Sequence, residues 1–223
     1  MPPPIGCGDI AVSDYPIAVV NLQTARCIVV GGGEVAARKV AGLRAAGARP
    51  VVISPDLGQI LRQQAEAGEL ETIRRKYQSG DLAGARLVIA ATDDPDTNES
   101  VWQEAQAIGC LVNVVDDPAR CNFHVPATVR RGALSVSVST GGSSPLLARR
   151  IRQDLEQQFD AAYEPYLVLL GDLRPIVREH VPDPARRKAI WEALLNSKIF
   201  ELLRAGELEK ARRRAHTILG TYC

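Results

Sequence analysis

Aromatic residues, long apolar runs and excess charge are all scarce in this chain. Only 4% of its 223 residues are Phe, Trp or Tyr, so the core must be built mainly from Val, Leu, Ile and Ala. No uninterrupted apolar segment approaches the roughly 20 residues that a membrane-spanning helix needs. The formal net charge of +1 argues against a general nucleic-acid-binding protein, although a local basic pocket remains compatible with it. We therefore expect a soluble globular protein without a nucleic-acid or membrane partner.

Cysteine and histidine form no recognisable metal-binding pattern. The 5 cysteines contain no Cys-x-x-Cys pair, and the 3 histidines are far apart in sequence. Cys121 and His124 are close, but two ligands in one loop do not make a metal site. Cys27 and Cys110 lie in apolar runs and are interpreted as small core residues. We expect no metal site, and a reducing cytoplasm rather than a disulfide framework. Residues 1–6 lack the features of a signal peptide and are interpreted as a flexible lead-in.

The most informative stretch is RCIVVGGGEVAARK, residues 26–39. The apolar residues 27–30 predict a buried parallel strand, three glycines follow, and an alanine-rich helix comes next. The spacing Gly31-x-Gly33-x-x-Ala36 matches the dinucleotide-binding fingerprint with Ala in its third place. Gly31 allows a sharp turn, Gly33 lets a pyrophosphate approach the backbone, and Ala36 lets the helix pack closely on the sheet. The free N–H groups of the helix N-terminus favour phosphate binding. The competing interpretation is a flavodoxin-like turn that binds no dinucleotide.

Strands and helices alternate through the first half of the chain. We expect strands at residues 49–53, 70–75, 85–91 and 111–115, with an edge strand at residues 15–22. This alternation predicts a doubly wound, Rossmann-type parallel sheet. Ligands of such sheets bind outside the carboxyl ends of the strands, so Thr92 and Asp93 are predicted to lie at the cofactor crevice. Asp96 or Thr97 is expected to cap the following helix, and Gly109 to end it.

Asp56 has two interpretations. It follows the second strand at close to the spacing of about 20 residues at which an acidic residue binds the adenosine ribose. It is also a suitable N-cap for a helix at residues 57–67. Since no Arg follows directly to hold a 2′-phosphate, we predict NAD rather than NADP. The basic residues 74–76 are interpreted as a solvated strand end rather than a site.

The second half of the chain changes character. Residues 125–139 predict a hairpin around Arg131-Gly132, because apolar residues and serines alternate in its second strand. Such a hairpin needs a partner surface, for which an intersubunit contact is a natural candidate. Ser143 or Ser144 is expected to cap a helix at residues 146–159 that begins near Pro145. Further helices are predicted at residues 163–181, 184–195, 198–205 and 207–219.

The carboxylates of Asp116 and Asp117 stand at the predicted end of the fifth strand, beside the crevice. A carboxylate in that place can transfer a proton next to a hydride transfer, whereas an Asp-Asp-Pro sequence is also a common turn. The residues alone do not separate these interpretations.

Five motifs in order resemble the precorrin-2 dehydrogenase family, which includes the dehydrogenase and ferrochelatase part of siroheme synthase. They are residues 31–39 (GGGEVAARK), 91–94 (ATDD), 113–117 (NVVDD), 121–126 (CNFHVP) and 139–149 (STGGSSPLLAR). The resemblance implies NAD-dependent oxidation of precorrin-2 to sirohydrochlorin, with Fe²⁺ insertion, a lyase reaction, in some members. It also implies a homodimer with a Rossmann domain (1–115), a hairpin dimerisation region (116–147) and a helical domain (148–223).

The resemblance also assigns residues. The family's essential general acid/base matches Asp116, and its NAD contacts match Glu34, Val35, Pro55 and Asp56. Because the substrate carries many carboxylates, cationic residues near the crevice are candidate contacts, although ordinary surface charge explains them equally well. These candidates are Arg130, Arg131, Arg149 and Arg150, with His124 interpreted as structural or substrate-facing.

One departure from the family pattern concerns regulation. Thr140 replaces a serine that is regulatory in some members, so we expect no such regulation here. Two other functions remain open: an NAD-binding regulatory module without turnover, and a chelatase that no longer uses NAD. The first leaves the NVVD and GGSSP segments unexplained, and the intact glycine fingerprint argues against the second.

Overall fold

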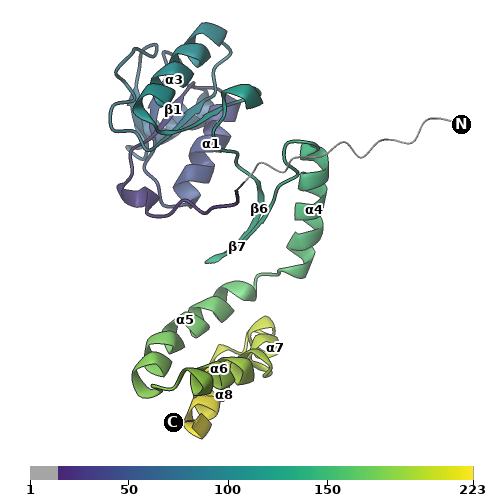
Figure 1. Cartoon of the computed structure of the whole chain (residues 1–223). Helices are drawn as coiled ribbons and strands as arrows, with labels where there is room; N and C mark the ends of the chain where they lie inside the picture. The colour runs from purple at the N-terminus through teal and green to yellow at the C-terminus, as the bar shows by residue number, and fades with distance from the viewer. Residues whose placement is uncertain (1–14, 223) are drawn as a thin grey trace, which may run out of the picture. The chain divides into compact units, whose positions relative to one another are not determined.

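The computed structural model describes residues 15–222, which form two compact units that divide between Val125 and Pro126 (Figure 1). The lead-in expected at residues 1–6 lies outside the described residues, as do Cys7 and Cys223. Each unit has its own hydrophobic core, so each is described by itself.

A five-stranded parallel sheet forms the centre of the first unit. Its order is β3-β2-β1-β4-β5, and all four neighbouring pairs are parallel. The strands are β1 (Cys27–Val30), β2 (Val51–Ile53), β3 (Glu71–Ile73), β4 (Leu87–Ala90) and β5 (Leu111–Val114). The predicted Rossmann-type sheet is therefore confirmed, and the chain reverses its direction of winding at β1 and β4, where such sheets bind ligands.

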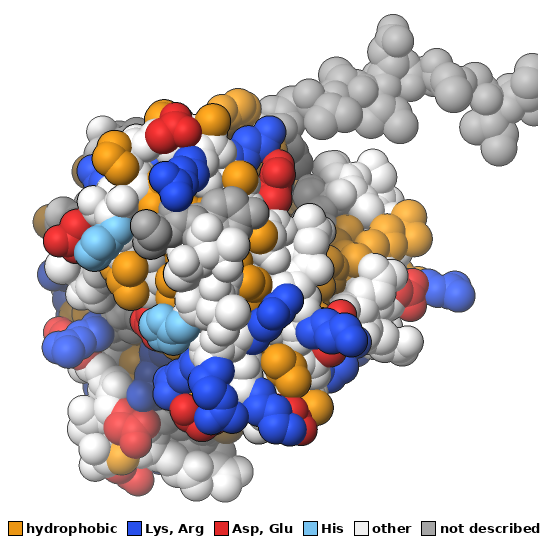
Figure 2. Space-filling model, turned by 90° about the horizontal axis from the view of Figure 1, so that it is seen from below, with side chains coloured by type: hydrophobic (Ala, Val, Ile, Leu, Met, Phe, Trp, Pro, Cys, Tyr) orange, Lys and Arg blue, Asp and Glu red, His pale blue; other side chains and the backbone are white. Residues whose placement is uncertain are grey.

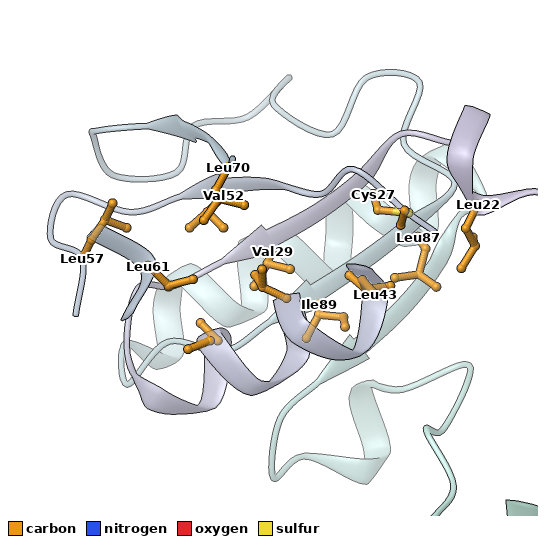
Figure 3. Packing of buried hydrophobic residues seen from close by; sticks show 14 residues of the cluster. Leu22, Cys27, Val29, Leu43, Val52, Leu57, Leu61, Leu70, Leu87 and Ile89 are labelled. Atoms are coloured by element: carbon orange, nitrogen blue, oxygen red, sulfur yellow. The ribbon is translucent and has the colours of Figure 1, made fainter. Parts of the chain in front are cut away.

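Helices cover both faces of this sheet. They are α1 (Glu34–Ala45), α2 (Gln59–Glu66) and α3 (Pro95–Ile108). Side chains alternate along β1, so Val29 faces the core that contains α1 and α2, whereas Ile28 faces the core that contains α3. Figure 3 shows Val29 and Ile89 beside Leu43 of α1. Because both faces are covered, β1 is buried along its whole length, as its unbroken apolar sequence predicts.

Two local predictions were wrong, and one of the two interpretations of Asp56 is excluded. Residues 15–22 form no strand; a short 3₁₀ helix at Leu22–Thr24 follows Asn21, whose φ of 59° ends any extended conformation. The N-cap of α3 is Asp94, whose carboxylate accepts from the backbone N–H of Asp96, so neither Asp96 nor Thr97 is the cap. Pro95 in the first helical turn favours a cap directly before it.

The N-cap of α2 is Gly58, so Asp56 does not cap that helix.

The second unit begins with the predicted hairpin, β6 (Ala127–Arg131) and β7 (Leu134–Val138), which is antiparallel. Ser144 caps α4 (Pro145–Gln158), since its Oγ accepts from the N–H of Leu147 at 3.2 Å. The remaining helices are α5 (Tyr163–His180), α6 (Pro184–Leu195), α7 (Ile199–Arg204) and α8 (Leu208–Tyr222). They share one apolar core, and their order agrees with the sequence-based prediction.

The surface is mixed in character. Figure 2 shows one face on which several Lys and Arg side chains lie beside one another, with hydrophobic side chains between them. Within residues 15–222, no helix is both long enough and apolar enough to cross a membrane.

Candidate functional site

A cavity of 780 Å³ opens at the carboxyl ends of β1, β2 and β4. It is where a doubly wound sheet binds its ligand. Every residue that the sequence assigned to cofactor binding lines this cavity, namely Gly31, Gly33, Glu34, Val35, Pro55, Asp56, Thr92 and Asp93. The structure therefore brings together residues from three separate segments of the chain.

The three glycines of this turn differ in whether their surroundings leave room for a Cβ atom. Gly31 has a φ of 121°, and a Cβ there would lie 2.2 Å from the carbonyl oxygen of Ala91. A Cβ on Gly32 would lie 1.9 Å from the carbonyl oxygen of Asp56, a constraint that the fingerprint did not reveal. A Cβ on Gly33 would meet no protein atom within 4 Å. Gly31 and Gly32 are thus required by the fold, whereas the space above Gly33 is open to a bound group.

The N-terminus of α1 borders the cavity. Gly33 is its N-cap and provides no side-chain hydrogen bond, so the first N–H groups of the helix have no side-chain acceptor at that position. Free N–H groups and the positive end of the helix dipole favour an anion such as a pyrophosphate. The cavity, the open space above Gly33 and this helix end together fit a dinucleotide.

The loops after β2 and β4 are fixed by their own hydrogen bonds. The Oγ of Ser54 donates to the carbonyl oxygen of Asp56 at 2.7 Å, which holds the Asp56 backbone against the glycine turn. The side-chain amide of Asn98 donates to the carbonyl oxygen of Thr92 at 3.0 Å. Asp56 does not cap α2, and it lines the cavity.

Lys76 and Tyr77 also line the cavity, although residues 74–76 were interpreted as a solvated strand end. Lys76 is exposed, as that interpretation expects, and the partly exposed Arg75 pairs with Asp81 at 2.7 Å. Tyr77 donates its hydroxyl to Glu104, and burial, followed by this carboxylate, raises its pKa. A strand prediction contains no signal for these contacts, because they depend on how the segment after β3 folds back onto α3.

Asp116 lies two residues after the end of β5 and is exposed. Its φ of 61° is a left-handed conformation that Asp adopts more readily than most residues. It does not line the cavity. Its charge acts on Lys39 of α1, whose pKa is lowered by burial and Arg38, while Cys121 and Asp116 act in the opposite direction. Asp116 thus has a half-buried cation in its neighbourhood, which the sequence did not reveal.

Asp117 is in a different environment. Its carboxylate forms an ion pair with Arg120, and Arg120 also contacts Glu99 of α3 at 2.5 Å. Among residues 15–222, the ion pairs do not include Asp116. The geometry therefore distinguishes two carboxylates that the sequence left equivalent: Asp117 anchors the turn, and Asp116 remains available.

Two asparagines explain the NVVD and CNF motifs. Asn113 is buried in β5, and its side-chain amide donates to the carbonyl oxygen of Phe123 at 3.1 Å. The side chain of Asn122 accepts from the N–H of Val112 at 2.7 Å and donates to the carbonyl oxygen of Cys110 at 2.9 Å. These bonds hold the segment that follows Asp116 against β5, and so they fix the turn that presents Asp116.

The residues proposed to bind the substrate are less closely grouped than the cofactor-binding residues. Arg130, Arg149 and Arg150 are exposed in the second unit, and His124 is exposed in the first. Arg131 donates to the carbonyl oxygen of Glu156 at 3.2 Å, which connects β6 to α4. In the part of the chain that the structure describes, no three His, Cys, Asp or Glu side chains are arranged to hold a metal ion.

Three protein families match consecutive segments of the chain. Residues 18–127 match the family described as putative NAD(P)-binding. Residues 131–158 match the sirohaem biosynthesis protein central family, and residues 167–219 match the sirohaem synthase dimerisation region.

Curated relatives show the same likeness. The chain is 43% identical over 200 residues to a siroheme synthase of Pseudomonas putida, covering 90% of this chain and 43% of the relative. It is 38% identical over 200 residues to a siroheme synthase of Methylobacillus flagellatus, with the same shares covered. The chain thus spans less than half the length of these relatives.

A solved structure extends the comparison to the fold. SirC, precorrin-2 dehydrogenase, superposes with a TM-score of 0.72 and 25% identity, over 91% of this chain and 100% of that one. The resemblance inferred from the five motifs is therefore confirmed. A lyase classification does not follow from these matches.

Proposed function

We propose that this relative of siroheme synthases oxidises precorrin-2 to sirohydrochlorin with NAD as the hydride acceptor. The observation that carries the proposal is the open space above Gly33 in a dinucleotide cavity. The similarity to siroheme synthases over 90% of the chain, and to a precorrin-2 dehydrogenase in fold, supports the choice of substrate.

The cavity residues would hold the cofactor by complementary chemistry. The turn at Gly33 and the N-terminus of α1 suit the pyrophosphate, and the carboxylate of Asp56 suits the hydroxyls of the adenosine ribose. A carboxylate there repels a 2′-phosphate, which favours NAD over NADP. When bound, NAD supplies the acceptor for the hydride that leaves the macrocycle.

Asp116 is our candidate for handling the proton. The oxidation removes one hydride and one proton from precorrin-2, and an exposed, unpaired carboxylate can accept that proton. Lys39 of α1 places a positive charge in the neighbourhood of Asp116. Among the cationic candidates, Arg130, Arg149 and Arg150 remain proposals for binding the substrate carboxylates.

The assembly and location belong to the same proposal. We propose a homodimer, supported by the match of residues 167–219 to a dimerisation region, and the three-part division at residues 115 and 147. Cytoplasmic location is supported by three free thiols among the described residues, Cys27, Cys110 and Cys121.

An anaerobic assay tests the proposal. The purified protein is mixed with precorrin-2, with and without NAD, and NADH is followed together with the sirohydrochlorin spectrum; Fe²⁺ is added last. NADH formation with appearance of that spectrum is the expected result. If NAD binds and no NADH forms, the chain is a regulatory module. If no NADH forms and the protein accelerates Fe²⁺ insertion relative to the protein-free control, the protein is a chelatase.

A further inference from the structure

A second groove lies within the second unit, mostly in its helical part. Its volume is 850 Å³, within the range of about 300–1,000 Å³ that is usual for small-molecule sites. It runs between α5 and α6 and reaches the turn of the β6–β7 hairpin. The lining residues that matter here are Leu170, Arg174, Arg178, Arg187, Trp191 and Leu195.

The floor of the groove is apolar and incompletely covered. Leu170 and Trp191 are only partly buried, although both pack against the core of the helical module. Leu195 is 56% exposed at the end of α6. A partly exposed indole between two leucines offers a flat apolar surface on which a ring system can stack.

Three arginines surround this floor. Arg174 and Arg178 are exposed on α5, and Arg187 is partly buried on α6, where it donates to the carbonyl oxygen of Pro182 at 3.2 Å. Within residues 15–222, none of the three forms an ion pair, and no Asp or Glu lines the groove. Three arginines without an ion-pair partner among these residues therefore line one groove.

We propose that this groove binds a polycarboxylate tetrapyrrole, with the macrocycle against Trp191 and its carboxylate arms on Arg174 and Arg178. The proposal rests on the proposed function and adds a second element of substrate or product recognition to it. A flat apolar ring with negative arms matches a flat apolar floor with an arginine rim, because guanidinium groups bind carboxylates with paired hydrogen bonds.

A second copy of the chain fits the groove less well. Where the groove lies on the two-fold axis of a dimer, it faces the same groove of the second copy, and the arginines of both copies repel one another. The groove is therefore not expected on the axis of the dimer contact proposed for residues 167–219.

The test measures binding of uroporphyrin III, a polycarboxylate macrocycle, to the full-length protein by the change in its absorption spectrum. The double substitution Arg174→Gln and Arg178→Gln should weaken binding by about tenfold, since each exposed ion pair contributes up to about fivefold. The matched control is Arg186→Gln, an exposed arginine of α6 outside the groove, which should leave the affinity unchanged. As a second variant, Leu195→Glu places a negative charge at an exposed position of the groove and should weaken binding as well.

The outcomes separate the alternatives. Unchanged affinity in the double variant, or equal losses in the double variant and the control, overturns the proposal. So does a double variant that becomes monomeric by light scattering while its affinity is unchanged, because the groove is then a subunit contact. Measuring NADH formation from precorrin-2 in parallel separates the two proposals. Turnover without groove-dependent binding refutes only the groove, and groove-dependent binding without turnover refutes only the proposed function.

Discussion

Substituting Gly31 by alanine should mainly destabilise the fold, whereas substituting Gly33 by alanine should mainly weaken NAD binding. At Gly31 the new Cβ lies 2.2 Å from the carbonyl oxygen of Ala91, in a backbone with a φ of 121°. Steric overlap and the unfavourable φ together cost about 3 kcal/mol of unfolding free energy, which corresponds to a fall of about 6–12 °C in Tm. At Gly33 the Cβ meets no protein atom within 4 Å and the φ is −81°, so the change only replaces a favourable N-cap residue, and stability should fall by no more than about 1 kcal/mol.

The same Gly33→Ala variant should bind NAD about 10- to 100-fold more weakly, which is the loss of one or two charge-assisted hydrogen bonds at the helix N-terminus. Thermal unfolding measures the first effect, and calorimetric titration with NAD measures the second. A Gly33→Ala protein that is folded and binds NAD as tightly as the unsubstituted protein refutes the assignment of this turn to the pyrophosphate.

Three further predictions concern the supports of the site. Asp117→Asn removes an ion pair whose partner, Arg120, is partly exposed, so urea titration should show a loss of at most about 1 kcal/mol, and turnover should persist. Asn122→Ala leaves the N–H of Val112 without its acceptor and should cost about 1–3 kcal/mol in the same experiment. For Tyr77, the folded-state pKa is raised by burial and by Glu104, so its stabilising effect is complete below the ordinary tyrosine value of about 10 and declines at higher pH. The difference in unfolding free energy between the unsubstituted protein and Tyr77→Phe should therefore shrink above that pH, and a difference that grows would contradict the assigned hydrogen bond.

The elements that the sequence predicted well are those that a local pattern determines. The apolar run at Cys27–Val30 needs burial on both faces, and the alternation in Leu134–Val138 needs burial on one, so their strands follow from periodicity. Residues 15–22 are apolar too, but no sheet edge pairs with them in the structure, and an apolar composition alone does not supply a partner.

Contacts between segments that are distant in the sequence could not be predicted from local sequence patterns. The contact of Tyr77 with Glu104 depends on the path of the loop between β3 and β4. The difference between Asp116 and Asp117 depends on Arg120. The cap at Asp94, in contrast, had a local signal in Pro95, which suits the first helical turn directly after the cap.

The central claim is that Asp116 serves an NAD-dependent oxidation of precorrin-2. The most direct measurement compares turnover of Asp116→Asn with that of Asp117→Asn under anaerobic conditions, with NAD affinity measured for both variants. Asn tolerates the left-handed backbone at position 116, so the substitution removes the charge without straining the turn. We predict that NADH formation falls by about 10²- to 10⁴-fold in Asp116→Asn alone, while NAD affinity is unchanged. Turnover in Asp116→Asn equal to that of the unsubstituted protein would contradict the claim.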